Sequence, residues 1–143
     1  MMSDDPPAGP APLLDANILL AAVLSDHPAG EAAISWLAGP GAAGFAVCPI
    51  TQGAVVRGLL RTGVTARGAR AALASVADLP GYEFWPDALS YLDVPLDKVI
   101  GHRQVTDAYL VELARSRGRH ILTFDRGLIQ AHPDAARAPV TPG

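Results

Sequence analysis

The chain has 143 residues with a formal net charge of −3, and 50% of the residues are hydrophobic while 17% are charged; this composition excludes an intrinsically disordered protein and fits one folded domain. The longest apolar run, residues 18–24, is far shorter than the roughly 18 residues of a membrane span, and a single cysteine, Cys48, excludes an internal disulfide. The negative charge excludes the basic field of proteins that coat nucleic acids, but it does not exclude a nuclease whose acids bind a metal ion.

Acids and prolines in residues 1–10 indicate a flexible tail without the basic and apolar segments of a signal peptide. We therefore expect a cytoplasmic protein with one domain over residues 11–140. The segments typical of strands are continuous apolar runs, at 12–14, 44–49, 82–86, 119–124 and, at the sheet edge, 138–140.

Caps, helical spacing and closing glycines indicate helices between these strands. The predicted helices are 17–24, 28–38, 51–60, 65–76, 87–91, 106–117 and 125–131. Pro28 is expected at the first helical position of the second helix, and Thr51 and Thr65 are expected as N-caps. This alternation predicts an α/β fold with a mainly parallel sheet of four to five strands that helices cover on both faces.

Three acidic residues are expected at one edge of this sheet. Asp15 directly follows the first strand, Asp125 directly follows the fourth, and Asp107 lies in the first turn of the helix before the fourth strand. Ligands of parallel sheets bind beyond the carboxyl ends of the strands, near the point where strand order reverses. Each acid alone could equally be a helix cap or a favourable first-turn residue. Spacing alone leaves both interpretations open.

Converging carboxylates without clustered cysteine or histidine favour a hard cation, Mg²⁺ or Mn²⁺, over zinc. Like charges at close range raise the pKa of at least one carboxyl group unless a divalent ion neutralises them. The chemistry that suits such a site is hydrolysis of a phosphodiester bond by a metal-activated water.

Six ordered segments carry a family resemblance, and together they cover nearly the whole chain. They are LLDANILLAAV (13–23), DHPAGEAAISWL (26–37), CPITQGAVVRGL (48–59), FWPDALSY (84–91), VTDAYLVELARSRG (105–118) and ILTFDRGL (121–128). In this order and spacing they resemble the PIN domain, and within it the VapC-type ribonuclease toxins of bacterial toxin–antitoxin pairs. The resemblance implies a three-layer α/β/α sandwich, Mg²⁺- or Mn²⁺-dependent endoribonuclease activity, a homodimer, and a cognate antitoxin that covers the active site.

The resemblance also assigns roles to individual positions. Asp15, Asp107 and Asp125 match the acids that hold the metal ion in this family. Asn17 matches the polar residue two places after the first acid, and Thr123 matches the hydroxyl residue before the last acid. All five are therefore candidate catalytic residues.

Gln52, a further candidate, departs from the family pattern. Many members have glutamate directly after the threonine of the third segment, where this chain has Gln52. An amide oxygen can coordinate a cation or orient a water, but it carries no charge, so the resemblance implies one principal Mg²⁺ here. The alternative hypothesis is a catalytically weak PIN module that binds RNA or an antitoxin.

Several basic residues are candidates for contacts with the phosphates of RNA. They are Arg57, which matches an arginine common among these toxins, Arg61, Arg103, Arg126 and His102. The arginines could equally pair with neighbouring acids, and His102 could be an ordinary loop residue. Both tryptophans and Cys48 are expected in the core.

Overall fold

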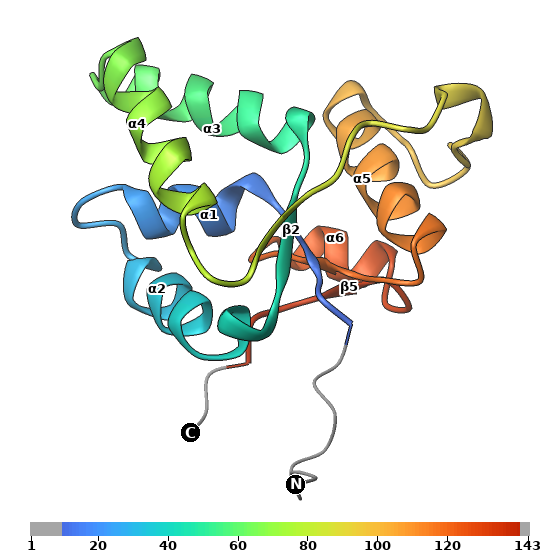
Figure 1. The fold of residues 1–143 in the computed structure, drawn as a ribbon. Coiled ribbons are helices and arrows are strands. Elements are labelled where there is room, and N and C mark those ends of the chain that lie inside the picture. The colour runs from blue at the N-terminus through green and yellow to red at the C-terminus, as the bar shows by residue number, and fades with distance from the viewer. Residues whose placement is uncertain (1–9, 141–143) are drawn as a thin grey trace, which may run out of the picture.

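The computed structural model describes residues 10–140 (Figure 1). The tail expected over residues 1–10 therefore lies, apart from Pro10, outside the described residues. A five-stranded sheet crosses the middle of the domain, in the order β3-β2-β1-β4-β5, and every neighbouring pair of strands is parallel. The strands are β1 (Leu13–Leu14), β2 (Phe45–Val47), β3 (Tyr82–Phe84), β4 (Ile121–Leu122) and β5 (Ala136–Arg137). The prediction of a parallel sheet is confirmed, and strand order reverses at β1.

Helices lie on both sides of this sheet, as the three-layer prediction requires. They are α1 (Ala16–Val23), α2 (Gly30–Ala38), α3 (Pro49–Arg61), α4 (Ala66–Ala77), α5 (Val105–Ser116) and α6 (Arg126–Ala131), with 3₁₀ turns η1 (Pro40–Ala43), η2 (Tyr91–Asp93) and η3 (His102–Gln104). Figure 1 shows α1 to α4 grouped on one side and α5 with α6 on the other. Leu13 packs in the core beside α5 and α6 and Leu14 in the core beside α1 to α4, because successive strand residues point to opposite faces.

Two helix starts differ from the prediction by two residues, and the other four differ by one. The second helix begins at Gly30 rather than Pro28, because Asp26 adopts a left-handed backbone conformation (φ 59°) and His27 Nδ1 accepts a hydrogen bond from the Ala29 amide at 3.0 Å. Helix α3 begins already at Pro49, so Thr51 lies inside the helix and is not its N-cap. Thr65 does cap α4, and its hydroxyl oxygen accepts from the Gly68 amide at 3.0 Å.

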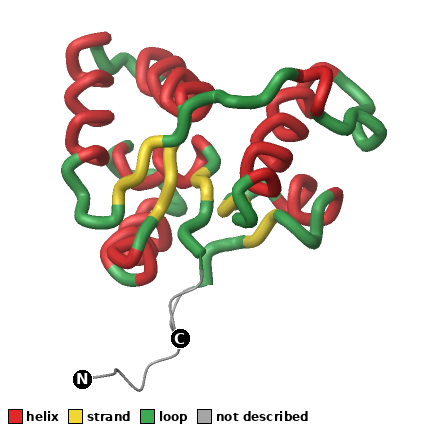
Figure 2. Tube along the Cα trace, turned by 45° about the vertical axis from the view of Figure 1, so that its right-hand side comes forward, coloured by secondary structure: helices red, strands yellow, loops and turns green. Residues whose placement is uncertain are grey.

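The largest difference from the predicted elements lies between β3 and α5. Figure 2 shows this segment as a long loop across one end of the domain. No helix forms at residues 87–91; only the 3₁₀ turn η2 begins there, at Tyr91. The Tyr109 hydroxyl bonds both backbone groups of Leu89, at 3.2 Å and 3.1 Å, in place of helical partners. Strand β5 likewise pairs through residues 136–137 and not through 138–140, where Pro139 has no amide hydrogen to donate.

The core contains the residues expected there. Trp85 and Cys48 are fully buried and Trp36 is 6% exposed. The guanidinium groups of Arg117 and Arg119 lie 4.7 Å and 5.7 Å from the centre of the Trp85 ring. Within residues 10–140 no helix is long and apolar enough to cross a membrane.

Candidate active site at the carboxyl ends of β1 and β4

Asp15 lies where β1 ends and α1 begins. Its amide donates to the Leu122 carbonyl of the neighbouring β4 at 2.9 Å, which fixes its backbone in the sheet. One carboxylate oxygen accepts from the Ala16 amide at 2.7 Å, and the other accepts from the Thr123 hydroxyl at 2.8 Å. Burial raises the pKa of Asp15 above its usual range, the charge of Asp125 adds to this effect, and the hydrogen bonds oppose it.

The Thr123 hydroxyl links the two strand ends. Thr123 is fully buried, and its oxygen accepts from the Asn17 side-chain amide at 3.1 Å and from the Asp125 backbone amide at 3.0 Å. The Asn17 side-chain oxygen in turn accepts from the Phe124 amide at 3.2 Å. One donated and two accepted bonds fill the capacity of a hydroxyl. The network therefore brings Asp15, Asn17, Thr123 and Asp125 together, as the sequence predicts.

Asp125 is the N-cap of the short helix α6. Its Oδ1 accepts from the Leu128 amide at 3.2 Å. A Cβ atom on Gly127 would lie 3.2 Å from the same oxygen, so a larger residue there would crowd the carboxylate. The capping interpretation that the sequence left open is correct for Asp125, and the same is true of Asp15. Capping does not exclude ligand binding by these carboxylates, because their negative charges also act on the third acid, Asp107.

Asp107 completes the group from the first turn of α5. Its side chain is half-buried, and its pKa is raised to about 6 by burial first and then by the negative charges of Asp15 and Asp125. The negative charges of Asp15 and Asp125 thus both act on Asp107. Among the described residues, no hydrogen bond or ion pair to the Asp107 carboxylate is found. Within residues 10–140, the charge of this carboxylate is therefore uncompensated.

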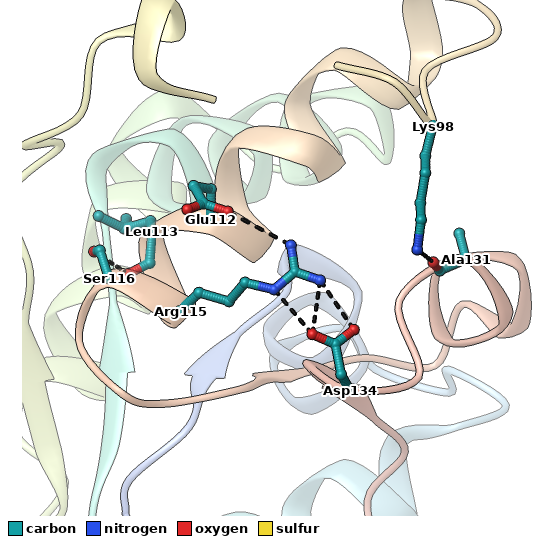
Figure 3. Close-up of polar contacts among 7 residues, drawn as sticks. All are labelled: Lys98, Glu112, Leu113, Arg115, Ser116, Ala131 and Asp134. Atoms are coloured by element: carbon teal, nitrogen blue, oxygen red, sulfur yellow. Dashed lines mark hydrogen bonds and ion pairs between the residues drawn. The ribbon is translucent and has the colours of Figure 1, made fainter. Parts of the chain in front are cut away.

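A cavity of about 490 Å³ opens beside Asp107 and Asp125. The residues that line it also include Gln104 and three basic residues, Lys98, Arg103 and Arg115. Figure 3 shows the polar contacts that Lys98 and Arg115 make. Arg115 binds Asp134 at 2.9 Å and Glu112 at 3.5 Å, and Lys98 Nζ donates to the Ala131 carbonyl at 2.6 Å.

A divalent cation fits the chemistry of this site. The donors are carboxylate oxygens, which hard cations prefer, and the raised pKa of Asp107 reflects negative charge that a cation would neutralise. Within residues 10–140, no three acidic, histidine or cysteine side chains already form a compact metal-binding group. The fit therefore rests on donor chemistry and charge, with Asp15 and Asp125 engaged by hydrogen bonds in this arrangement.

The structure separates the remaining candidates. Gln52 lies on α3 and its side-chain amide donates to the Tyr82 hydroxyl at 3.5 Å, on the β3 side of the sheet. Among the candidates for phosphate contact, Arg103 lines the cavity with the acids, whereas those that do not line it are Arg57, Arg61, Arg126 and His102. Sequence reasoning missed Gln104, whose side-chain oxygen accepts from the amides of Ile100 and Gly101. Gln104 supplies only the glutamine half of a capping box, because Gly101 has no side chain to supply the other half.

Comparison with known proteins agrees with the fold. The PIN domain family model matches residues 13–132, which include all three acids. Two relatives from Mycobacterium tuberculosis (strain ATCC 25618 / H37Rv) span almost the same length. Ribonuclease VapC29 is 49% identical over 124 residues, which are 87% of this chain and 92% of the relative. Ribonuclease VapC38 is 32% identical over 133 residues, which are 90% of this chain and 94% of the relative. The chain therefore belongs to the PIN domain family and is similar to its VapC ribonucleases.

Proposed function

We propose that this chain is an endoribonuclease that depends on Mg²⁺ or Mn²⁺ and acts as the toxin of a toxin–antitoxin pair. The relatives' name, ribonuclease, supports the reaction class. The observation that carries the metal dependence is the uncompensated charge of Asp107, whose pKa is raised to about 6 by burial and by Asp15 and Asp125. The likeness to VapC proteins supports an RNA substrate and a cognate antitoxin, and with them a homodimer that works in the cytoplasm.

Asp15, Asp107 and Asp125 would hold the cation. A divalent ion bound by these carboxylates supplies Lewis-acid activation of water and neutralises charge that grows on the phosphate oxygens. The chain's own contribution is to fix these carboxylates. Thr123 holds Asp15 by a hydrogen bond of 2.8 Å, and the Thr123 oxygen receives the amide of Asp125.

Asn17 and Gln52 have different supporting roles in this proposal. Asn17 joins the start of α1 to the end of β4, through its bonds to Thr123 and to the Phe124 amide. It therefore helps to hold Asp15 and Asp125 in fixed positions relative to each other. Gln52 is occupied by Tyr82 and brings no charge, which supports one principal cation.

The test is cleavage of a labelled, mixed-sequence single-stranded RNA by the purified full chain, with Mg²⁺ and with EDTA. We expect Asp15→Asn and Asp107→Asn each to lower cleavage by at least about 100-fold, as loss of a catalytic electrostatic group does, while circular dichroism shows a folded protein. Asp93→Asn, an exposed acid in η2, makes the same charge change away from the site and should leave cleavage unchanged.

Undiminished cleavage by both site variants would overturn the proposed site. Expression in bacteria distinguishes the alternative of a module that only binds RNA or an antitoxin. In that case growth arrest would survive Asp15→Asn, because binding alone would cause it. For a nuclease the arrest must disappear together with cleavage.

A further inference from the structure

Three basic side chains line the cavity beside the acids, and two of them are already engaged. Arg115 binds Asp134 through Nε at 3.1 Å and Nη2 at 2.9 Å, and it also contacts Glu112 (Figure 3). Lys98 donates to the carbonyl of Ala131 at the end of α6. These two cations therefore already have partners within the protein.

Arg103 is the third, and its guanidinium is available. Its side chain is exposed, and within residues 10–140 no hydrogen bond or ion pair engages it. It lies in η3, which leads directly into α5, and thus about one helical turn before Asp107. Arg103 lies outside α5 itself, but both it and Asp107 line the cavity.

The backbone that carries Arg103 is well fixed. The Gln104 side-chain oxygen accepts from the Ile100 and Gly101 amides, and the Gln104 amide donates to the Gly101 carbonyl at 3.1 Å. The Arg103 guanidinium is thus attached to a closed turn that continues into the helix bearing Asp107. A charged group on such a support loses less freedom when it binds a ligand than one on an open loop.

We propose that Arg103 binds a backbone phosphate of the RNA next to the phosphate that is cleaved, an assignment that rests on the function proposed above. A guanidinium matches phosphate oxygens with two parallel hydrogen bonds. A phosphate held at Asp107 and Asp125 lies at the cavity that Arg103 also lines, so Arg103 is placed for a neighbouring phosphate of the same RNA. Arg103 supplies positive charge to this phosphate. Arg115 and Lys98 are less available, because they are bound to oxygen atoms of the protein.

The test measures RNA binding by the full chain in an Asp107→Asn background, which prevents cleavage from obscuring the result. The probe is a fluorescein-labelled, random-sequence RNA pool of about 20 nucleotides, a length that exceeds the site size of single-strand-binding domains. Fluorescence anisotropy gives the dissociation constant between about 50 and 200 mM KCl. Arg103→Ala is compared with Arg103→Lys and with Arg70→Ala, an exposed arginine on α4 in the opposite helical layer.

We expect Arg103→Ala to weaken binding by up to about fivefold, as the loss of one exposed ion pair does. The slope of log K against log salt should fall in magnitude by about 0.7, the value for one phosphate contact on a single strand. Arg103→Lys should keep most of that slope, and Arg70→Ala should keep all of it. An unchanged slope in Arg103→Ala, or an equal fall in Arg70→Ala, would overturn the assignment.

Cleavage of the same RNA pool by the unmodified chain separates this inference from the proposed function. Cleavage without any effect of Arg103 on the salt slope would refute the phosphate contact alone. An effect on the slope without any cleavage would refute the nuclease proposal and leave the RNA contact standing.

Discussion

Replacing Asp107 with asparagine should make the cation-free protein more stable at neutral pH, although it should also abolish cleavage. The pKa of Asp107 is raised from 3.8 to about 6 by burial and by the charges of Asp15 and Asp125. A carboxyl group whose pKa is higher in the folded state binds its proton more tightly there than in the unfolded chain. The free energy of unfolding therefore decreases as the pH rises from below 3.8 to above 6. Asparagine has the same shape and no charge, so it escapes this loss.

The size of the effect follows from the same shift. The difference between about 6 and 3.8 is about 2 pKa units, and each unit corresponds to about 1.4 kcal/mol, so about 3 kcal/mol is the upper limit. Solvent screens part of this energy because the Asp107 side chain is only half-buried. We therefore expect a gain of about 1–2 kcal/mol, or roughly 4–8 °C in melting temperature for a domain of this size.

The assay is urea unfolding followed by circular dichroism in EDTA, for the unmodified chain and for Asp107→Asn, at pH 8 and at pH 4. The variant should be more stable at pH 8, and the difference should nearly vanish at pH 4, where the carboxyl group of the folded chain is protonated. Mg²⁺ should narrow the difference at pH 8, since binding to the folded chain alone stabilises it. Equal stability at pH 8 in EDTA, or a difference that does not depend on pH, would refute the reasoning.

Three further substitutions test the site and its support. Thr123→Val removes the hydroxyl that donates to Asp15 and should lower the free energy of urea unfolding by about 1–3 kcal/mol; unchanged stability would show that the network has little weight. Gly81→Ala should cost about 3 kcal/mol or more in the same assay, because its Cβ would overlap the Gly41 carbonyl oxygen; an unchanged melting temperature would contradict that close approach. Gln52→Glu should reduce the Mg²⁺ concentration for half-maximal cleavage roughly tenfold, about 1.4 kcal/mol; an unaltered Mg²⁺ dependence would show that position 52 does not reach the cation.

The sequence predicts the sheet and the strand-end acids because both follow from strong local patterns. Continuous apolar runs mark buried parallel strands, and Asp15 and Asp125 each come directly after such a run. Thr123 was a candidate only through the family resemblance, and its hydrogen bonds to both strand ends are known from the structure alone. The metal-binding role of the acids stays a prediction, because their hydrogen bonds also fit simple helix caps.

The loop between β3 and α5 could not be predicted, because its structure depends on a contact that is distant in sequence. The residues around Leu89 have the composition of a short helix, but Tyr109 takes both backbone groups of Leu89 from 20 residues away. The prediction of where α2 begins was wrong for a different reason. The left-handed conformation of Asp26 and the bond from the Ala29 amide to His27 use the residues that would otherwise begin the helix.

The choice among the basic residues also lies beyond sequence patterns. Arg57, Arg103 and Arg126 are equally exposed arginines near candidate site residues. Only the folded arrangement shows which of them shares a cavity with Asp107, and which neighbouring cations are neutralised by partners such as Asp134.

Strand β1 lies in the middle of the sheet, between β2 and β4. The Leu13 and Asp15 amides both donate to carbonyls beside or within β4, and neither residue can leave without breaking that pairing. Local opening of the outer loops therefore does not release Asp15 from the sheet. The Asp15 amide hydrogen should exchange with solvent only when the entire domain unfolds, so Asp15 keeps its position at the end of β1 until the fold is lost as a whole.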